Sequence, residues 1–384
     1  MKVGLIGPVH PFRSGEAQSN TMLCENLAAR HDVTAYSFKR LYPKALFPGR
    51  SQTYDSPKEL GFRASFELDS LDPTTWLRTA YRIRDAKLDV LLVTWWTIFL
   101  APLYVVLLNA VRRTTSTRIG ILAHNVYPHE DSVLNKVLAR AVLPLGDYYI
   151  VFSSKSLHEL RRLYPDADAS VLIETTYDRH FRQERSGQAA ARKKLGIEEP
   201  HVALFFGLVR PYKGLKYLIE AMPAALRAAD IRFLVVGEFW EDRRLFERRA
   251  EELGVRHKLT IVDRFVPDEE AVDYFDATDV FVLPYVGETG SAVVPLAYGY
   301  DRPVIVSNVL GLTDFVDDGE TGFVVPPQNP SALADALVRF FSSADKTEFF
   351  RKVAEKRRIF EWTPEKEAIV LNGRVEETRE ATPV

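Results

Sequence analysis

Short apolar runs alternate with amphipathic segments along almost the whole chain. Within the amphipathic segments, apolar residues recur at a spacing of about 3.6 positions, which is typical of helices that pack by one face. Strands that alternate with helices build parallel sheets covered by helices on both faces. The pattern therefore predicts an α/β protein with two doubly wound parallel sheets. The expected strands lie near 2–6, 32–38, 88–94, 118–123, 147–152, 170–173, 202–206, 231–236, 258–262, 279–283, 303–306 and 322–325.

A polar segment rich in arginine and lysine, residues 177–199, interrupts this pattern near the middle of the chain. With 384 residues the chain is long enough for two domains. We predict an N-terminal domain over 1–180, a linker over 181–199 and a C-terminal domain over 200–364, with 365–384 returning as a helix to the first domain. Doubly wound domains bind ligands at the carboxyl ends of their strands, so we expect the two domains to face each other across a ligand-binding cleft.

One charge-free run of 22 residues, 90–111, is long enough to cross a bilayer. Pro102 interrupts it, and a buried strand at 88–94 followed by a helix at 98–111 explains the same run without a spanning helix. The first residues lack the apolar run and cleavage site of a secretory signal. The single cysteine, Cys24, excludes an internal disulfide. We therefore expect a cytoplasmic protein.

The most informative segment is 205–214, with the sequence FFGLVRPYKG. It joins an apolar strand, a glycine turn and the start of an amphipathic helix. Unpaired backbone amides and the positive end of a helix dipole meet at such a junction. Arg210 and Lys213 add fixed positive charge beside them. The segment predicts a phosphate site, and the alternative is an ordinary turn with surface cations.

A second loop containing glycine follows the first strand. Its sequence, GPVHPFRSGE at 7–16, runs into a helix but has no G-x-G-x-x-G spacing. The missing spacing lowers the case for a dinucleotide cofactor. The glycines instead indicate a loop whose backbone comes close to a ligand.

With these motifs in order, the C-terminal half resembles the nucleotide-sugar-binding domain of the retaining glycosyltransferases of family four. The segments that carry the resemblance are 206–214, 235–237, 279–284, 302–307 and 318–323. The N-terminal half is similar more loosely, through its glycine loop and through His124-Asn125 at a strand end. The resemblance implies the architecture of two facing Rossmann-like domains called GT-B.

The resemblance also implies roles for individual residues. In such enzymes the arginine and lysine of an R-x-x-K pair hold the donor diphosphate, so Arg210 and Lys213 take that role and replace a metal. Electrostatic stabilisation of this kind contributes roughly 3 kcal/mol to a transition state. No metal and no other cofactor is expected. His124 matches a histidine that contacts the donor sugar. The other donor-binding residues implied are Ser14, Gly15, Gly207, Gly237, Glu238, Phe265 and Val266.

The sequence departs from the family at one diagnostic point. The family commonly has two glutamates, the first near the sugar and the second on the ribose hydroxyls. The second should fall at Val294 or Pro295, and neither is acidic. Glu288 stands near the first position, and we predict a catalytic role for it. The residues that follow resemble a variant in which a serine and a small residue open a helix and present amides to the ligand. The predicted donor-binding residues there are Gly290, Ser291, Ala292 and Val293.

The acidic residues outside these motifs do not predict a metal site. Asp166 and Asp168 spell D-x-D but lie in a polar turn. Asp273, Asp276 and Asp279 span the end of an expected helix and the start of a strand. We interpret these three as solvated helix surface and turn.

The resemblance implies transfer of a sugar from a nucleoside diphosphate donor to a glycan or lipid-linked acceptor, in cell-envelope or exopolysaccharide synthesis. One alternative is a sugar-nucleotide epimerase, for which the acid–base residues are few. Another is a non-catalytic sugar-nucleotide-binding subunit, suggested by the missing glutamate. Basic and aromatic residues at 38–50 predict contact with an anionic membrane surface on its inner face, with a solvated loop as the alternative. No nucleic-acid partner is expected.

Overall fold

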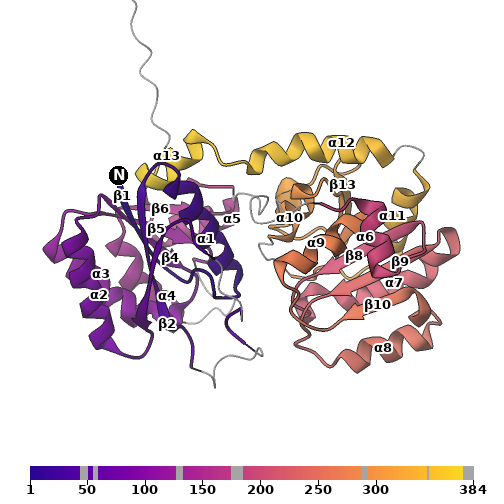
Figure 1. The fold of residues 1–384 in the computed structure, drawn as a ribbon, viewed down its shortest axis with the longest axis horizontal. Coiled ribbons are helices and arrows are strands. Elements are labelled where there is room, and N and C mark those ends of the chain that lie inside the picture. The colour runs from indigo at the N-terminus through magenta and orange to yellow at the C-terminus, as the bar shows by residue number, and fades with distance from the viewer. Residues whose placement is uncertain are drawn as a thin grey trace, which may run out of the picture. The chain divides into compact units, whose positions relative to one another are not determined.

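The computed structural model describes residues 1–43, 51–54, 59–126, 133–173, 185–287, 292–343 and 346–374. The chain divides into two compact units (Figure 1). The first unit comprises Met1–Glu174 together with Trp362–Val384, and the second comprises Thr175–Glu361. Each unit has its own parallel sheet with helices on both faces, which confirms the predicted α/β fold class.

The first unit contains a seven-stranded sheet in the order β3-β2-β1-β4-β5-β6-β7. Its strands are β1 (Lys2–Ile6), β2 (Asp32–Arg40), β3 (Arg63–Asp69), β4 (Val90–Trp95), β5 (Arg118–Ala123), β6 (Tyr148–Val151) and β7 (Ala169–Val171). Its helices include α1 (Gly15–Ala28), α2 (Pro73–Ala86), α3 (Ala101–Thr114), α4 (Val133–Val142), α5 (Ser154–Leu163) and α13 (Pro364–Asn372). Six of these strands were predicted, and β3 was missed.

Alternate residues of the central strands feed two separate apolar cores. In β4, Leu91 and Val93 belong to the core beneath α2, α3 and α4, whereas Val90 and Leu92 belong to the core that includes residues of α1 and α13. Burial on both faces is characteristic of parallel sheets. It explains why the strands appear in the sequence as continuous apolar runs.

The charge-free run 90–111 forms a strand and a helix, as the pattern favoured. Strand β4 is buried along its whole length, and α3 packs against α2. Among the described residues no helix combines the length and apolar character needed to span a bilayer.

The C-terminal helix α13 packs on the first unit (Figure 1). Val370 and Leu371 join the core that also contains residues of β1 and β6. Thr363 caps the amino end of α13, since its side chain accepts a hydrogen bond from the Lys366 amide. A cap of this kind satisfies one of the unpaired amides of the first turn.

The second unit contains a six-stranded sheet in the order β10-β9-β8-β11-β12-β13. Its strands are β8 (His201–Phe206), β9 (Ile231–Val236), β10 (Leu259–Val262), β11 (Val280–Leu283), β12 (Val304–Ser307) and β13 (Gly322–Val325). Its helices include α6 (Gln188–Leu195), α7 (Leu215–Ala228), α8 (Arg243–Glu252), α9 (Asp268–Ala277), α10 (Val293–Gly299), α11 (Pro330–Ser342) and α12 (Lys346–Lys356).

The interpretation of the three aspartates as solvated surface was wrong. Asp273, Asp276 and Asp279 are all buried. They pair in turn with Lys194, Arg185 and Arg192. These basic residues lie in or beside α6, within the segment 181–199 that was predicted as a linker. The ion pairs attach residues 185–194 to α9 and the start of β11.

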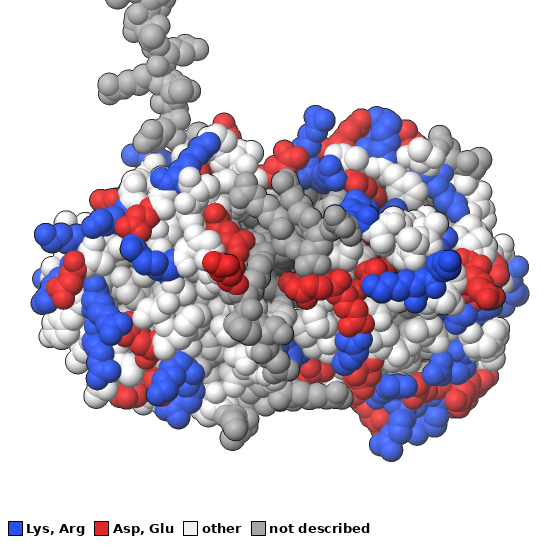
Figure 2. Space-filling view, viewed as in Figure 1, with Lys and Arg blue, Asp and Glu red and all other residues white. Residues whose placement is uncertain are grey.

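The described part of the basic segment 38–50 ends at residue 43. Phe38 and Leu41 are buried in the core of the first unit, whereas Lys39 and Arg40 are exposed. Residues 44–50 lie outside the described residues. On the face of the molecule in Figure 2, the coloured basic and acidic side chains are interspersed over both units.

Candidate functional site

Two glycines bring the loops after β8 and β9 into close contact. The Gly207 amide donates to the Val236 carbonyl at 2.9 Å, and the Gly237 amide donates to the Val262 carbonyl at 3.0 Å. Gly237 has a φ of 151°, and a Cβ placed on it would lie 2.0 Å from the Gly207 carbonyl oxygen. No side chain fits at that distance, so the crossing of the two loops requires glycine at 237.

The predicted cation pair follows this contact between Gly207 and Gly237. Arg210 precedes the short 3₁₀ helix η5 (Pro211–Lys213), and Lys213 ends it. The Arg210 Cζ stands 3.7 Å from the centre of the Trp240 ring. The Lys213 Nζ lies 5.3 Å from the centre of the Tyr285 ring. Among the described residues, aromatic rings rather than carboxylates are the partners of both cations.

The Lys213 ammonium occupies the space beside Gly207. A Cβ on Gly207 would lie 2.9 Å from the Lys213 Nζ, so the missing side chain lets the ammonium approach the strand end. Gly207 itself has a φ of 105°. The two glycines and two cations therefore converge on the carboxyl ends of β8 and β9, where parallel sheets of this type bind ligands.

Glu238 is buried, with 5% of its surface exposed. Its Oε1 accepts a hydrogen bond from Trp240 Nε1 at 3.3 Å. Burial raises the pKa of the nearby Glu241 carboxyl, and Lys216 acts on that pKa in the opposite direction. Glu238 lies at the carboxyl end of β9, as predicted.

Phe265 and Val266 lie in the segment between β10 and α9, beyond the carboxyl end of the neighbouring strand. Val266 is buried and Phe265 is partly buried. The Phe239 amide donates to Asp263 Oδ1 at 3.1 Å, which joins this segment to the loop after β9. Gly207, Gly237, Glu238, Phe265 and Val266 therefore lie beyond the ends of three adjacent strands, β8, β9 and β10.

Ala292 and Val293 form the start of α10. Val294 and Pro295, where the family has its second glutamate, are buried in that helix. Glu288, Gly290 and Ser291 lie outside the described residues. The predicted roles of Glu288, Gly290, Ser291, Ala292 and Val293 stay predictions.

In the first unit, Ser14 caps α1 and Gly15 is its first residue. The Ser14 Oγ accepts from the Ala17 amide at 3.1 Å. The loop before them is held by residues 51–54, since the Arg13 amide donates to the Gln52 carbonyl at 2.9 Å. A Cβ on Gly15 would have nothing within 4 Å, so the backbone there faces open space.

His124 follows the last residue of β5. Its amide donates to the Trp95 carbonyl at 2.9 Å, and its ring stacks on Phe152 with the ring centres 4.3 Å apart. The strand pairing of β5 with β4 thus continues to His124. Ser14, Gly15 and His124 lie beyond the carboxyl ends of strands in the first unit, whereas Arg210 and Lys213 belong to the second.

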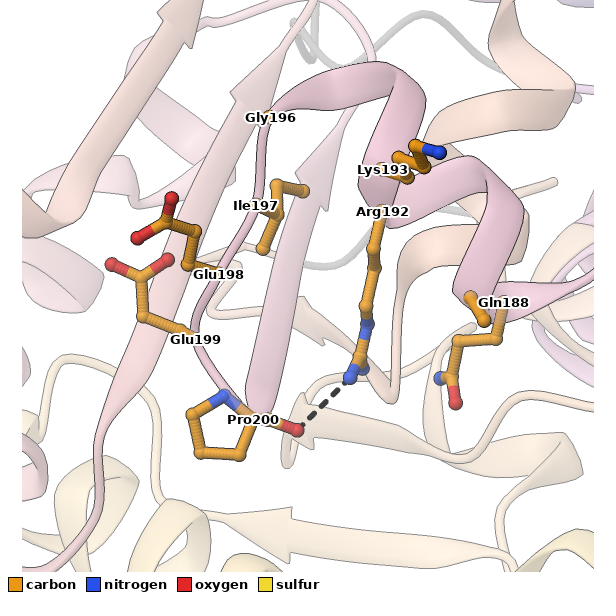
Figure 3. Close-up of a pocket in the computed structure, with 9 residues that line it drawn as sticks. Gln188, Arg192, Lys193, Gly196, Ile197, Glu198, Glu199 and Pro200 are labelled. Atoms are coloured by element: carbon orange, nitrogen blue, oxygen red, sulfur yellow. Dashed lines mark hydrogen bonds between the residues drawn. The ribbon is translucent and has the colours of Figure 1, made fainter.

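A surface pocket lies at the opposite end of the second sheet (Figure 3). It is formed by α6 and by the segment Gly196–Pro200 that enters β8. Arg192 crosses it to donate to the Pro200 carbonyl at 3.0 Å. Because Pro200 precedes β8 and Gly207 follows it, this pocket is separate from the predicted site.

Sequence reasoning missed Trp240 and Tyr285, the two aromatic partners of the cation pair. Neither lies in a segment whose spacing marks it as functional. Trp240 comes three residues after Gly237, and its position beyond a strand's carboxyl end was the only available signal.

Two Rossmann-like units in one chain, with a glycine and cation cluster after the first strand of the second, define the GT-B class of glycosyltransferase fold. Residues 200–343 match the family described as "Glycosyl transferases group 1". This match confirms the resemblance found in the sequence. Residues 200–343 of the second unit are therefore similar to group 1 glycosyltransferases.

Solved structures share the fold over nearly the whole chain. Sucrose-phosphate synthase from Thermosynechococcus elongatus has a TM-score of 0.71 and 21% identity, with 96% of each chain covered. Anabaena HepE in complex with UDP and glucose has a TM-score of 0.72 and 15% identity, covering 94% of this chain and 96% of HepE. At such identities the likeness shows the GT-B fold alone.

Curated relatives match over shorter stretches. The D-inositol 3-phosphate glycosyltransferase of Streptomyces scabiei is 31% identical over 216 residues, which cover 53% of this chain and 48% of the relative. An uncharacterized glycosyltransferase of Methanocaldococcus jannaschii is 31% identical over 166 residues, 43% of this chain and 42% of the relative. The chain thus spans about half the length of these relatives.

Proposed function

We propose that this protein is a retaining glycosyltransferase, which moves a sugar from a nucleoside diphosphate donor to a glycan or lipid-linked acceptor without a metal. The observation that carries the proposal is the Arg210 and Lys213 pair at the strand ends of the second unit. In the described residues, neither cation is neutralised by an ion pair with a carboxylate. Such charges are suited to hold a diphosphate.

The relatives support the nature of the ligand. The HepE structures hold UDP and glucose, or UDP-glucose. Several of the curated relatives are D-inositol 3-phosphate glycosyltransferases. A nucleotide sugar is the donor that we infer for this chain by the same chemistry.

In the proposed reaction the bond between the sugar C1 and the diphosphate oxygen breaks, and a bond from C1 to the acceptor oxygen forms on the same face. The diphosphate takes up the acceptor's proton. Arg210 and Lys213 stabilise the negative charge that gathers on the departing diphosphate, which is the largest electrostatic change of the step. His124 and Glu288 are proposed to act near the sugar.

Binding is tested first, by thermal unfolding with UDP, GDP, ADP and dTDP. A ligand that binds only the folded state raises the melting temperature. Turnover with the matching nucleotide sugars is then compared for Arg210→Ala and Lys213→Ala. Each should cut turnover by about tenfold to a hundredfold, which corresponds to roughly 1.4–3 kcal/mol.

Lys216→Ala is the matched control, because it removes an exposed positive charge three residues beyond Lys213. It should leave turnover nearly unchanged. Full activity in both the Arg210 and Lys213 variants would show that the site is assigned wrongly. Incubation with a nucleotide sugar and no acceptor separates the alternatives: an epimerase yields isomerised donor, and a binding subunit yields neither hydrolysis nor transfer.

We also propose that the acceptor belongs to cell-envelope or exopolysaccharide synthesis at the inner face of the membrane. Because Phe38 and Leu41 are buried and Arg40 pairs with Asp69, we propose that membrane contact through 38–50 uses the exposed Lys39 and the rest of the segment from Tyr42 onward. Flotation with vesicles of anionic lipid tests this contact. Failure to bind the vesicles even at low salt would exclude it.

A further inference from the structure

Trp240 lies against Arg210 although the two residues come from different strand ends. The Arg210 guanidinium carbon stands 3.7 Å from the centre of the indole ring, within the range of a cation–π contact. Arg210 follows β8 and Trp240 follows β9. The contact is therefore set by the way in which these two loops pair.

Backbone hydrogen bonds fix the two loops beyond the glycine crossing. The Val209 amide donates to the Glu238 carbonyl at 2.9 Å, and the Trp240 amide donates to the Val209 carbonyl at 3.0 Å. Beyond the ends of β8 and β9, the two segments thus form one further parallel bridge, between Val209 and Phe239. Arg210 and Trp240 directly follow the two bridged residues, so the backbone positions from which their side chains extend are fixed.

The indole ring is held from its other edge as well. Trp240 Nε1 donates to Glu238 Oε1 at 3.3 Å, and Glu238 is 5% exposed. A buried carboxylate that accepts this hydrogen bond fixes the rotation of the ring. The face of the ring is then presented to the guanidinium.

Other arginines of the second unit are held by carboxylates instead. Arg192 donates to Asp279 at 2.7 Å, and Arg232 donates to Glu199 at 2.6 Å. For Arg210, by contrast, the aromatic ring is the contact, and its Nε is buried without a hydrogen-bond acceptor among the described residues. A ring attracts a guanidinium by its quadrupole and cancels none of its charge.

From this geometry we infer that Trp240 is a positioning residue, which holds the Arg210 guanidinium for the donor diphosphate without neutralising it. The inference rests on the proposed function. A carboxylate in the place of the ring would compete with the diphosphate for the same donor groups. The ring leaves those groups available for an anion. Glu238 acts on Arg210 only indirectly, because it fixes the orientation of the Trp240 ring.

The test is a double-mutant cycle on nucleotide affinity. UDP, GDP, ADP and dTDP are titrated into the full chain by calorimetry, and the tightest binder is used throughout. The proteins are the wild type, Trp240→Leu, Arg210→Ala and the double variant. Trp240→Leu should weaken binding by about fivefold to twentyfold, and it should weaken it no further once Arg210 is alanine.

Two more variants separate positioning from folding. Trp240→Phe keeps an aromatic face but loses the Nε1 hydrogen bond to Glu238, so it should retain more affinity than Trp240→Leu and less than the wild type. Trp240→Met keeps the bulk of the side chain without an aromatic face and should behave like Trp240→Leu. The methionine variant replaces the leucine variant if the latter does not fold. Phe239→Leu removes a neighbouring aromatic side chain, which packs on Phe246, and should leave affinity unchanged.

The outcomes distinguish the two proposals. Equal weakening by Trp240→Leu in the wild-type and Arg210→Ala backgrounds would overturn the inference, because the ring would then act on the ligand or on the fold directly. Full affinity in both Trp240→Leu and Trp240→Met would overturn it as well. If Arg210→Ala itself binds the nucleotide like the wild type, or no nucleotide binds, the proposed function fails and the inference fails with it.

Discussion

The Tyr148 hydroxyl donates a hydrogen bond of 2.7 Å to the Val370 carbonyl, 222 positions further along the chain. The same hydroxyl lies 3.2 Å from the Leu371 carbonyl. Tyr148 belongs to β6 and both carbonyls belong to α13, so one buried side chain links the C-terminal helix to the first sheet. Gly373 adds to this fit, since a Cβ there would lie 2.8 Å from Tyr148 Cβ.

Tyr148→Phe should loosen α13 without unfolding the sheet. The change removes a buried hydrogen bond and leaves carbonyls without that donor, at a cost of about 1 kcal/mol. Amide exchange in α13 should therefore become about fivefold faster, as measured by mass spectrometry. Tyr149→Phe is the control, because its hydroxyl donates to the Leu143 carbonyl and not to α13. Equal exchange of α13 in the two variants would contradict the prediction.

Gly15→Ala should preserve the fold and lower activity. A methyl at this position meets no atom within 4 Å, so the free energy of unfolding should change by less than about 0.5 kcal/mol. If the loop approaches the donor closely, the methyl occupies ligand space and turnover falls by at least about tenfold. Gly61→Ala, which also points into open space, should leave turnover unchanged. Normal turnover in Gly15→Ala would remove this loop from the site.

Gly237→Ala should be severely destabilising. Its Cβ would overlap the Gly207 carbonyl, and its φ of 151° is strained for any other residue. We expect a loss of about 3 kcal/mol or more in urea unfolding. Gly254→Ala is the matched control, since Gly254 has a φ of 71° but open space around it, and should cost about 1 kcal/mol. Similar losses in both variants would mean that the close contact of the two loops does not contribute to the free energy of unfolding.

Glu199 should make stability depend on acid pH. Burial alone would raise the pKa of this carboxyl, but hydrogen bonds from Arg232 and Lys258 outweigh burial and lower the pKa to about 2. A pKa below the ordinary value of 4.5 gives stability that is complete above that value and is lost as the pH falls toward 2. The stability difference between wild type and Glu199→Gln should shrink by about 2 kcal/mol from about pH 6 to about pH 3.

Glu198→Gln is the control for this measurement, because Glu198 is exposed and forms no ion pair among the described residues. Its stability difference from the wild type should stay constant over the same range. Urea unfolding at each pH provides the values. A constant difference for Glu199→Gln would show that its ion pairs do not contribute to stability.

The fold could be predicted because burial on both faces makes the strands continuous apolar runs. Strand β3 escaped this reasoning, since only Leu68 of its seven residues is buried and the rest alternate in polarity. The environment of Asp276 could not be predicted either. Its partner Arg185 lies 91 positions away, and no local pattern reports a contact at that separation.

The candidate site likewise has a part that could be predicted from the sequence and a part that could not. The glycine and cation cluster is local, so the spacing of Gly207, Arg210 and Lys213 was enough to predict it. Trp240 meets Arg210 only because two loops pair across the sheet. Such a contact depends on the register of β8 with β9, which a single sequence does not reveal.

The return of α13 to the first unit has a consequence for the newly made protein. Because residues 175–361 form one uninterrupted unit and the first unit also needs residues from 362 onward, the ribosome makes the whole second unit before it makes α13. The second unit can therefore fold while the first unit still lacks α13, and removal of residues 362–374 would leave the first unit with apolar core residues uncovered.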